Sequence, residues 1–195
     1  MIFGNKFKKN NNTPSKSIDQ LIKDASDIID LRLKVMNISC KYYDKLLALY
    51  NSMNNKNIQD VYNQFVDIDS KGQDEVNEFC NDIKSKDNDI NDGIKFYMND
   101  DFEANKQKFS KLLDKIKKAN SDADKINKKY GGNFSSSDDA YYYTEDKFMK
   151  NSKVSKIDNR IGEKSAITLQ EWAFLIATNI ENIASDFEYY SGLNN

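Results

Sequence analysis

The side chains that most often perform acid–base or metal chemistry are absent or scattered in this sequence. It has no histidine, which is the commonest general base and the commonest metal ligand. Two acidic clusters, Asp87-Asn88-Asp89 and Asp100-Asp101, lack the position-six glycine and position-12 glutamate of a calcium-binding loop. We interpret them as a solvated helix face. The sequence predicts no catalytic residue, no metal site and no cofactor, and a protein that is not an enzyme.

The cysteine and aromatic side chains are better explained by packing than by chemistry. Cys40 and Cys80 fall within apolar helical patterns and form no C-x-x-C pair, so we expect two buried thiols. Tyrosines and phenylalanines recur at helical spacing without the interleaved basic residues of RNA-binding motifs. We assign them, together with Trp172, to a core or a dimer seam, and we expect no nucleic-acid partner.

The composition favours long helices. Among 195 residues there are seven glycines and one proline, too few for many tight turns, and 31% of the residues are charged. No apolar stretch is long enough for a secretory signal or a membrane span. These features predict an all-α, cytoplasmic protein with a single domain.

The apolar periodicity predicts where the first two long helices lie. The first begins at a capping box at Ser17 and ends at residues 54–57. The period then continues from Ile58 to Tyr130. This stretch is either one helix of roughly 100 Å or a helix broken at Gly72 and Gly93, which would give a shorter, ordinary bundle.

A glycine- and serine-rich loop separates the second helix from the third. At Gly131-Gly132 we expect the chain to reverse, and Gly192 to end the third helix, with Gly162 favouring a break inside it. The predicted fold is therefore an elongated antiparallel bundle of three long kinked helices. It occupies residues 17–193 and follows a basic, flexible or amphipathic segment at residues 1–16.

Charge is strongly segregated along the chain. Residues 1–59 carry a net charge of +5, residues 60–103 carry −9, and residues 104–164 carry +6. Lysines flank Gly131-Gly132 on both sides, so an antiparallel hairpin would bring them together at one end of the molecule. A basic end would attract an anionic membrane at about 1 kcal/mol per lysine near the surface.

The N-terminal segment has the pattern of a membrane-inserting helix. Phe3 and Phe7 lie four residues apart, so a helix would place them on one face near Ile2, with lysines on its flanks. Together with the lysines around the glycine loop, this segment forms the candidate membrane-binding site. Its residues are Ile2, Phe3, Lys6, Phe7, Lys8, Lys9, Lys117, Lys118, Lys125, Lys128, Lys129, Lys147, Lys150 and Lys153.

Two stretches resemble the BAR-domain family, of the arfaptin and amphiphysin type. Residues 78–84, Glu-Phe-Cys-Asn-Asp-Ile-Lys, resemble the family's second helix, where an aromatic residue precedes an acidic–aliphatic–Lys step. Residues 175–193 end in Asp-Phe-Glu-Tyr-Tyr-Ser-Gly-Leu and resemble the end of its third helix, where paired aromatics precede a glycine.

The resemblance implies a curved homodimer, peripheral to membranes, that senses or generates curvature of anionic phospholipid bilayers. It is compatible with endocytosis or vesicle traffic, and with a small GTPase or another protein partner. It also implies that Gly131-Gly132 lies at each distal tip, with the flanking lysines on lipid head groups. The acidic run from Asp60 to Glu103 would then lie on the convex side or near the dimer centre.

Two other classes of protein remain open at this point. A coiled-coil scaffold or interaction bundle would use the same apolar stripes for a partner helix and would have no membrane role. A helical-bundle enzyme or ligand-binding protein would need polar groups that converge in its core, and no Glu-x-x-His pair is present.

Overall fold

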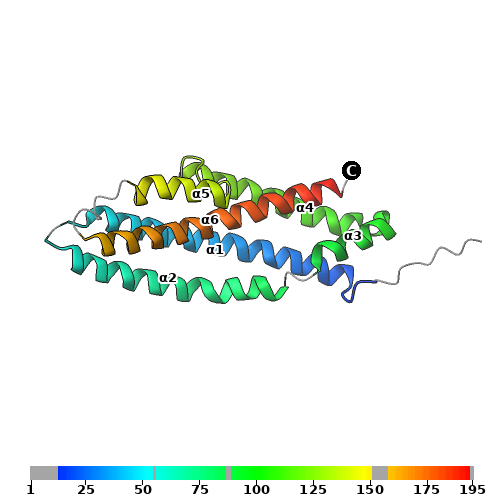
Figure 1. Cartoon of the computed structure of the whole chain (residues 1–195). Coiled ribbons are helices and arrows are strands. Elements are labelled where there is room, and N and C mark those ends of the chain that lie inside the picture. The colour runs from blue at the N-terminus through cyan, green and yellow to red at the C-terminus, as the bar shows by residue number, and fades with distance from the viewer. Residues whose placement is uncertain (1–12, 55, 87–88, 151–157, 194–195) are drawn as a thin grey trace, which may run out of the picture.

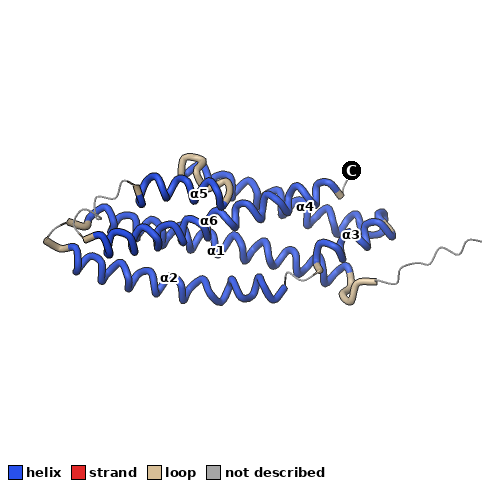
Figure 2. Tube along the Cα trace, viewed as in Figure 1, coloured by secondary structure: helices blue, strands red, loops and turns tan. Residues whose placement is uncertain are grey.

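The computed structural model describes residues 13–54, 56–86, 89–150 and 158–193. Figures 1 and 2 show that this part of the chain is helical and has no strand. The all-α prediction is confirmed, but six α-helices form where three long ones were expected. The elements are α1 (Ile18–Ser52), α2 (Ile58–Lys86), α3 (Ile90–Asp100), α4 (Phe102–Lys129), α5 (Ser137–Thr144), a π-helix η1 (Glu145–Met149) and α6 (Asn159–Gly192).

The long helices lie side by side along one axis, and the chain passes along that axis four times (Figure 1). The passes are α1, α2, α4 followed by α5 and η1, and finally α6. The short helix α3 joins the second pass to the third. α1 and α6 pack on each other in the centre, with α2 on one side and α4 and α5 on the other. This is the topology of an up-down-up-down helical bundle.

The second predicted helix is divided at aspartates and not at its glycines. Asp89, just before α3, has a left-handed φ of 62°, and Asp101 caps α4 by accepting a hydrogen bond from Ala104 N at 3.0 Å. Gly72 and Gly93 instead lie inside α2 and α3. The interpretation of the acidic clusters as a helix face was therefore wrong at Asp89 and Asp101, which mark helix ends. Of the two alternatives, the shorter bundle forms.

The glycine loop ends α4 with a well-defined cap. Gly131 and Gly132 have φ values of 71° and 78°, which favour glycine. Gly131 N donates to Lys128 O at 3.0 Å, and Gly132 N donates to Asn127 O at 2.9 Å. These two bonds form a Schellman motif. Phe134 then enters the core, where it is fully buried.

The chain does not reverse after this loop. Ring contacts follow α1 in order, because Phe134 packs on Tyr43 with centroids 5.6 Å apart and Phe148 packs on Tyr50 at 5.4 Å. The third pass therefore continues parallel to α1 through α5 and η1. The predicted hairpin at Gly131-Gly132 was wrong, and the loop lies on the side of the bundle and not at a tip (Figure 2).

The last pass is a single uninterrupted helix. Asp158 caps α6 by accepting hydrogen bonds from the backbone nitrogens of Arg160 and Ile161 at 3.0 and 3.3 Å. The helix then continues through Gly162, which is buried. The break expected at Gly162 does not occur. α6 extends through Gly192, but its C-cap is Leu193, and Gly192 lacks the positive φ of the glycine cap that the sequence predicted.

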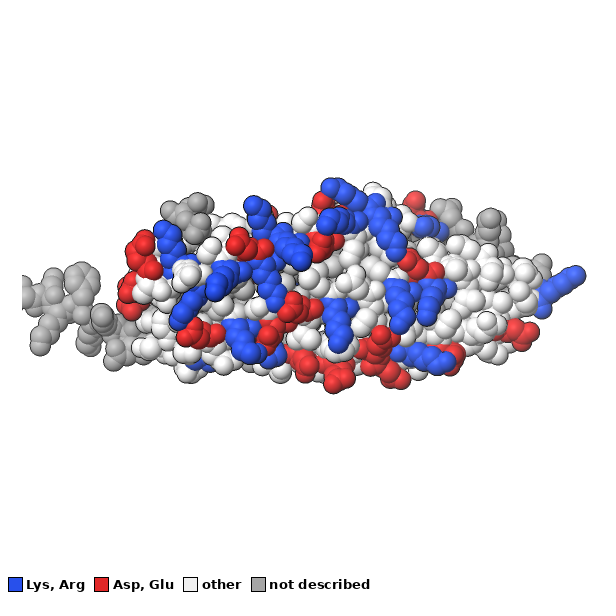
Figure 3. Space-filling view, turned by 180° about the vertical axis from the view of Figure 1, so that it is seen from behind, with Lys and Arg blue, Asp and Glu red and all other residues white. Residues whose placement is uncertain are grey.

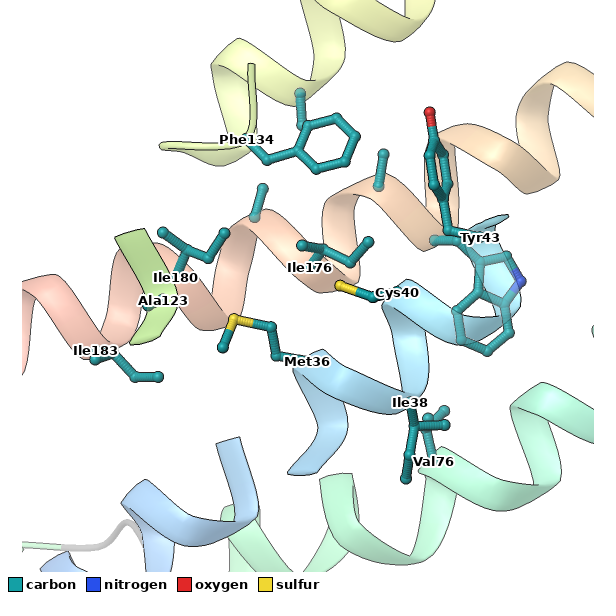
Figure 4. Packing of buried hydrophobic residues seen from close by; sticks show 14 of the residues in the cluster. Met36, Ile38, Cys40, Tyr43, Val76, Ala123, Phe134, Ile176, Ile180 and Ile183 are labelled. Atoms are coloured by element: carbon teal, nitrogen blue, oxygen red, sulfur yellow. The ribbon is translucent and has the colours of Figure 1, made fainter. Parts of the chain in front are cut away.

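The core is centred between α1 and α6. Figure 4 shows Met36 and Cys40 of α1 beside Ile176 of α6, with Phe134 above them. Cys40 is buried, as predicted, and burial raises the pKa of its thiol. Cys80 of α2 is only half-buried, so the prediction of a buried thiol was wrong there.

Gly72 allows α2 to approach the single tryptophan closely. A Cβ atom at this position would lie 2.6 Å from Trp172 Cζ2 and 2.8 Å from Tyr42 Cδ1. Trp172 is fully buried, as predicted, stacks on Tyr42 with centroids 5.5 Å apart, and donates to Asp69 Oδ1 at 2.7 Å. This contact joins α1, α2 and α6.

We expect Gly72→Ala to lower the free energy of unfolding by about 1–3 kcal/mol, because the added methyl group overpacks the contact with Trp172. Urea unfolding followed by circular dichroism measures the change. Gly192→Ala is the matched control, since no atom lies within 4 Å of a Cβ atom there. A Gly72→Ala protein as stable as this control would contradict the prediction.

Candidate membrane-binding surface

α4 concentrates positive charge on the outside of the bundle. The helix carries nine lysines and four acidic side chains. Its buried residues share one face, formed mainly by Phe109, Leu112, Ile116, Ala119 and Ala123. The lysines therefore cover the remaining faces, and their spacing sorts them into rows along the helix.

One row of lysines faces α1 and is paired with aspartates of that helix. The pairs are Lys108 with Asp19 and Lys115 with Asp30, both at 2.6 Å, and Lys129 with Asp44. The partner numbers rise together along both helices, which is the signature of parallel packing. Each of these lysines has an aspartate partner on α1, so its charge is largely neutralised within the bundle.

A second row points away from the bundle. Lys111, Lys118 and Lys125 recur every seven residues, about 10.5 Å along the helix, and we call them the outer lysine row. Within the described part of the chain, Lys111 and Lys118 form no ion pair, and neither does the adjacent Lys117. Lys125 contacts Asp122 at 2.8 Å, and this hydrogen bond lowers the pKa of Asp122.

The structure separates the site residues that the sequence grouped together. Lys117 and Lys118 are exposed and unpaired among the described residues, whereas Lys128 contacts Asp124 at 2.6 Å and Lys129 contacts Asp44. Seven other residues of the predicted site lie outside the described residues. They are Ile2, Phe3, Lys6, Phe7, Lys8, Lys9 and Lys153.

The lysines beyond the glycine loop do not extend the outer lysine row. Lys147 donates a hydrogen bond to the Tyr143 hydroxyl and lies 4.8 Å from the centre of that ring. Lys150 is exposed at the end of η1. Between Ser137 and Met149 the chain carries four acidic side chains and one lysine, so this part of the third pass is acidic. Lys111, in contrast, was left out of the predicted site, although its seven-residue spacing from Lys118 could have indicated it.

Part of the acidic sequence, in α2, lies on the other side of the bundle from α4. α2 has a net charge of −4 and packs on α1 across from α4 (Figure 1). Figure 3 shows lysine and arginine side chains over the upper and middle parts of one long face, with carboxylates gathered along its lower edge. The acidic side chains of α2 therefore lie apart from the lysines of α4, whereas Asp101 and Glu103 lie at the start of α4 itself.

The fold defines the class of protein as an all-α bundle whose chain passes four times along its axis. No protein-family model, no curated protein and no solved structure matches the chain. Among the described residues, no helix is long and apolar enough to cross a membrane.

Proposed function

We propose that this chain is a peripheral module that binds anionic membranes through the outer lysine row of α4. The observation that supports the proposal most directly is the concentration of unpaired lysines on the side of the bundle away from α2. In the BAR-like role that the resemblance implies, such binding would serve membrane traffic or remodelling and would favour curved bilayers.

The charge of this surface is sufficient for reversible binding. Lys111, Lys117 and Lys118, which form no ion pair among the described residues, would together contribute about 3 kcal/mol, at about 1 kcal/mol for each lysine close to the bilayer. The acidic side chains of α2 would face away from the bilayer, at least two helix diameters from it. That separation of about 20 Å exceeds the Debye length of about 8 Å in physiological salt, so their repulsion is screened.

The N-terminal segment supplies the second attachment in this proposal. Ile2, Phe3 and Phe7 would insert between lipid head groups, and the lysines beside them would add to the electrostatic attraction. Stable attachment by peripheral proteins commonly needs two such contributions. Removal of residues 1–12 should therefore weaken binding without abolishing its dependence on salt.

Co-sedimentation with vesicles tests the role of α4. We expect wild type to bind phosphatidylserine-containing vesicles at low salt and to release them at high salt. It should not bind neutral vesicles. The variant Lys111→Glu/Lys117→Glu/Lys118→Glu should bind roughly a hundredfold more weakly, because three attractive charges become repulsive. Vesicles of two diameters would show whether binding favours curvature.

A matched variant shows whether binding depends on the lysines of α4 or only on the net charge of the protein. Lys56→Glu/Lys84→Glu/Lys164→Glu changes the net charge equally, at exposed positions outside α4. It should bind within about threefold of wild type, with both variants folded by circular dichroism. Equal losses in the two variants, or a folded wild type that does not bind anionic vesicles, would refute the membrane role of α4.

A further inference from the structure

Exposed apolar side chains gather at one place on the bundle. Among the described residues, five large hydrophobic side chains are exposed, and four of them belong to α5, η1 and the facing part of α6. Tyr141 and Tyr142 are 41% and 68% exposed, and Met149 and Ile167 are each 39% exposed. The fifth, Val66, lies on α2. A cluster of this kind is unusual on a solvated surface and is typical of interaction sites.

Hydrogen bonds fix how α5 lies on α6. Ser137 N donates to Glu181 Oε2 at 3.1 Å, and Gln170 Nε2 donates to Thr144 Oγ1 at 3.0 Å, so the two helices run antiparallel. Between these bonds the Tyr141 ring stacks on Phe174, with centroids 6.2 Å apart and planes 13° from parallel.

The exposed apolar side chains therefore line the outside of one helix seam. We call Tyr141, Tyr142, Met149, Ile167 and Phe174 the aromatic patch. From Tyr141 to Met149 it extends about 12 Å, which is about two turns of a docked helix. One edge of it is the π-helix η1, an element often found at functional sites.

The rim of the aromatic patch is acidic around Tyr141 and Phe174. Asp138 and Asp139 precede Tyr141 on α5, Glu145 follows it on η1, and Glu171 lies on α6 between Ile167 and Phe174. Hydrogen bonds with the side chains of Ser135 and Ser136, including one that Ser135 Oγ donates to Asp139 Oδ2, lower the pKa of Asp139.

We propose that the aromatic patch binds a basic amphipathic helix of a partner protein. Tyrosine, phenylalanine and methionine are enriched in the centres of protein interfaces, and tyrosine is a frequent hot spot. An amphipathic helix would place its apolar anchors on the patch and its lysines or arginines against the acidic rim. Two copies of this chain meeting patch to patch would oppose their acidic rims, which disfavours a second copy as the occupant.

The test uses the full chain and two synthetic helical peptides of about four turns. One peptide has leucine and phenylalanine on one face and lysine on the other, and the second has glutamate in place of lysine. Fluorescence anisotropy should show saturable binding of the basic peptide only. Tyr142→Ala/Ile167→Ala should weaken binding at least tenfold, as expected for hot-spot residues, whereas Val66→Ala should leave it within about twofold.

The acidic rim is tested in the same way. Asp138→Asn/Glu145→Gln should weaken binding of the basic peptide and reduce its salt dependence, whereas Asp74→Asn/Glu78→Gln on α2 removes the same charge and should have little effect. The α4 variant that loses vesicle binding should still bind the peptide. This arm distinguishes failure of the patch from failure of the membrane role.

Several outcomes would overturn the proposal. These are no saturable binding of the basic peptide, equal binding of the acidic peptide, and equal losses in the α2 controls. Concentration-dependent self-association of wild type in analytical ultracentrifugation that Tyr142→Ala/Ile167→Ala abolishes would also overturn it, because the patch would then belong to a second copy.

Discussion

Replacing Arg32 by methionine is expected to lower the free energy of unfolding by about 3 kcal/mol. Arg32 lies on α1, and its guanidinium pairs with the Asp186 carboxylate on α6. Their side chains are only 8% and 18% exposed. Removing the arginine would leave a carboxylate in a largely desolvated position without its main counter-charge, which costs far more than loss of a surface ion pair.

A double variant tests this explanation. Arg32→Met/Asp186→Leu removes both charges and fills the site with apolar side chains, so it should recover most of the lost stability. Urea unfolding of wild type and the two variants gives the comparison, and Lys71→Met, which breaks an exposed ion pair with Asp67, is the surface control. If the double variant were as unstable as Arg32→Met, the uncompensated charge would not be the cause.

Trp172→Ala is expected to cost about 3–5 kcal/mol, because it empties the largest fully buried side chain of the core. Its effect should be coupled to that of Gly72. Once the indole is gone, the methyl group of Gly72→Ala no longer clashes with Trp172 and keeps only its close contact with Tyr42, so the double variant should be more stable than the sum of the single changes predicts.

Trp172→Phe is the control for the hydrogen bond to Asp69. It keeps an aromatic ring beside Tyr42 and loses only the indole donor and some volume, so it should be clearly milder than Trp172→Ala. Thermal unfolding and urea unfolding of the set measure the coupling. Strict additivity of Gly72→Ala and Trp172→Ala would show that the two residues do not share the contact described above.

The sequence was most informative where the governing interaction is local. Ser17 caps α1 by accepting a hydrogen bond from Gln20 N at 3.3 Å, as the sequence predicts. Trp172 and Cys40 are in the core, where their apolar surroundings placed them. A helix cap needs only a side chain and a backbone amide three residues later, and an apolar helix face is visible from residue spacing alone. Both can therefore be predicted without knowledge of the rest of the fold.

Predictions failed where a distant residue decides. A glycine inside an apolar helical pattern can mark either a bend or a close contact with another helix. At Gly72 only the position of Trp172, 100 residues later in the sequence, shows that it is a close contact. Gly131-Gly132 correctly marks the end of α4, but the direction of the chain after it depends on Phe134, which buries its ring against Tyr43.

The lysines of the candidate site also could not be sorted into paired and unpaired ones from the sequence. Charge totals along the sequence marked residues 104–164 as basic, but they could not reveal which lysines are neutralised. Lys115 and Lys129 contact aspartates 85 residues earlier in the chain, and they do so because α4 lies parallel to α1. A single unbroken second helix, antiparallel to α1, would have paired these lysines with other residues.

The four passes along the axis bring the start of α1 and the end of α6 to the same end of the bundle (Figure 1). The Tyr97 hydroxyl donates to Lys16 O at 3.2 Å, and the Tyr189 hydroxyl donates to Asn91 O at 3.2 Å, so the segment before α1 at Lys16 and the end of α6 both contact α3. Domains fused before α1 and after α6 would therefore emerge as neighbours from one pole. The opposite pole, at the turn between α1 and α2, would carry neither attachment, so the molecule can serve as a spacer that carries two attachments at a single end.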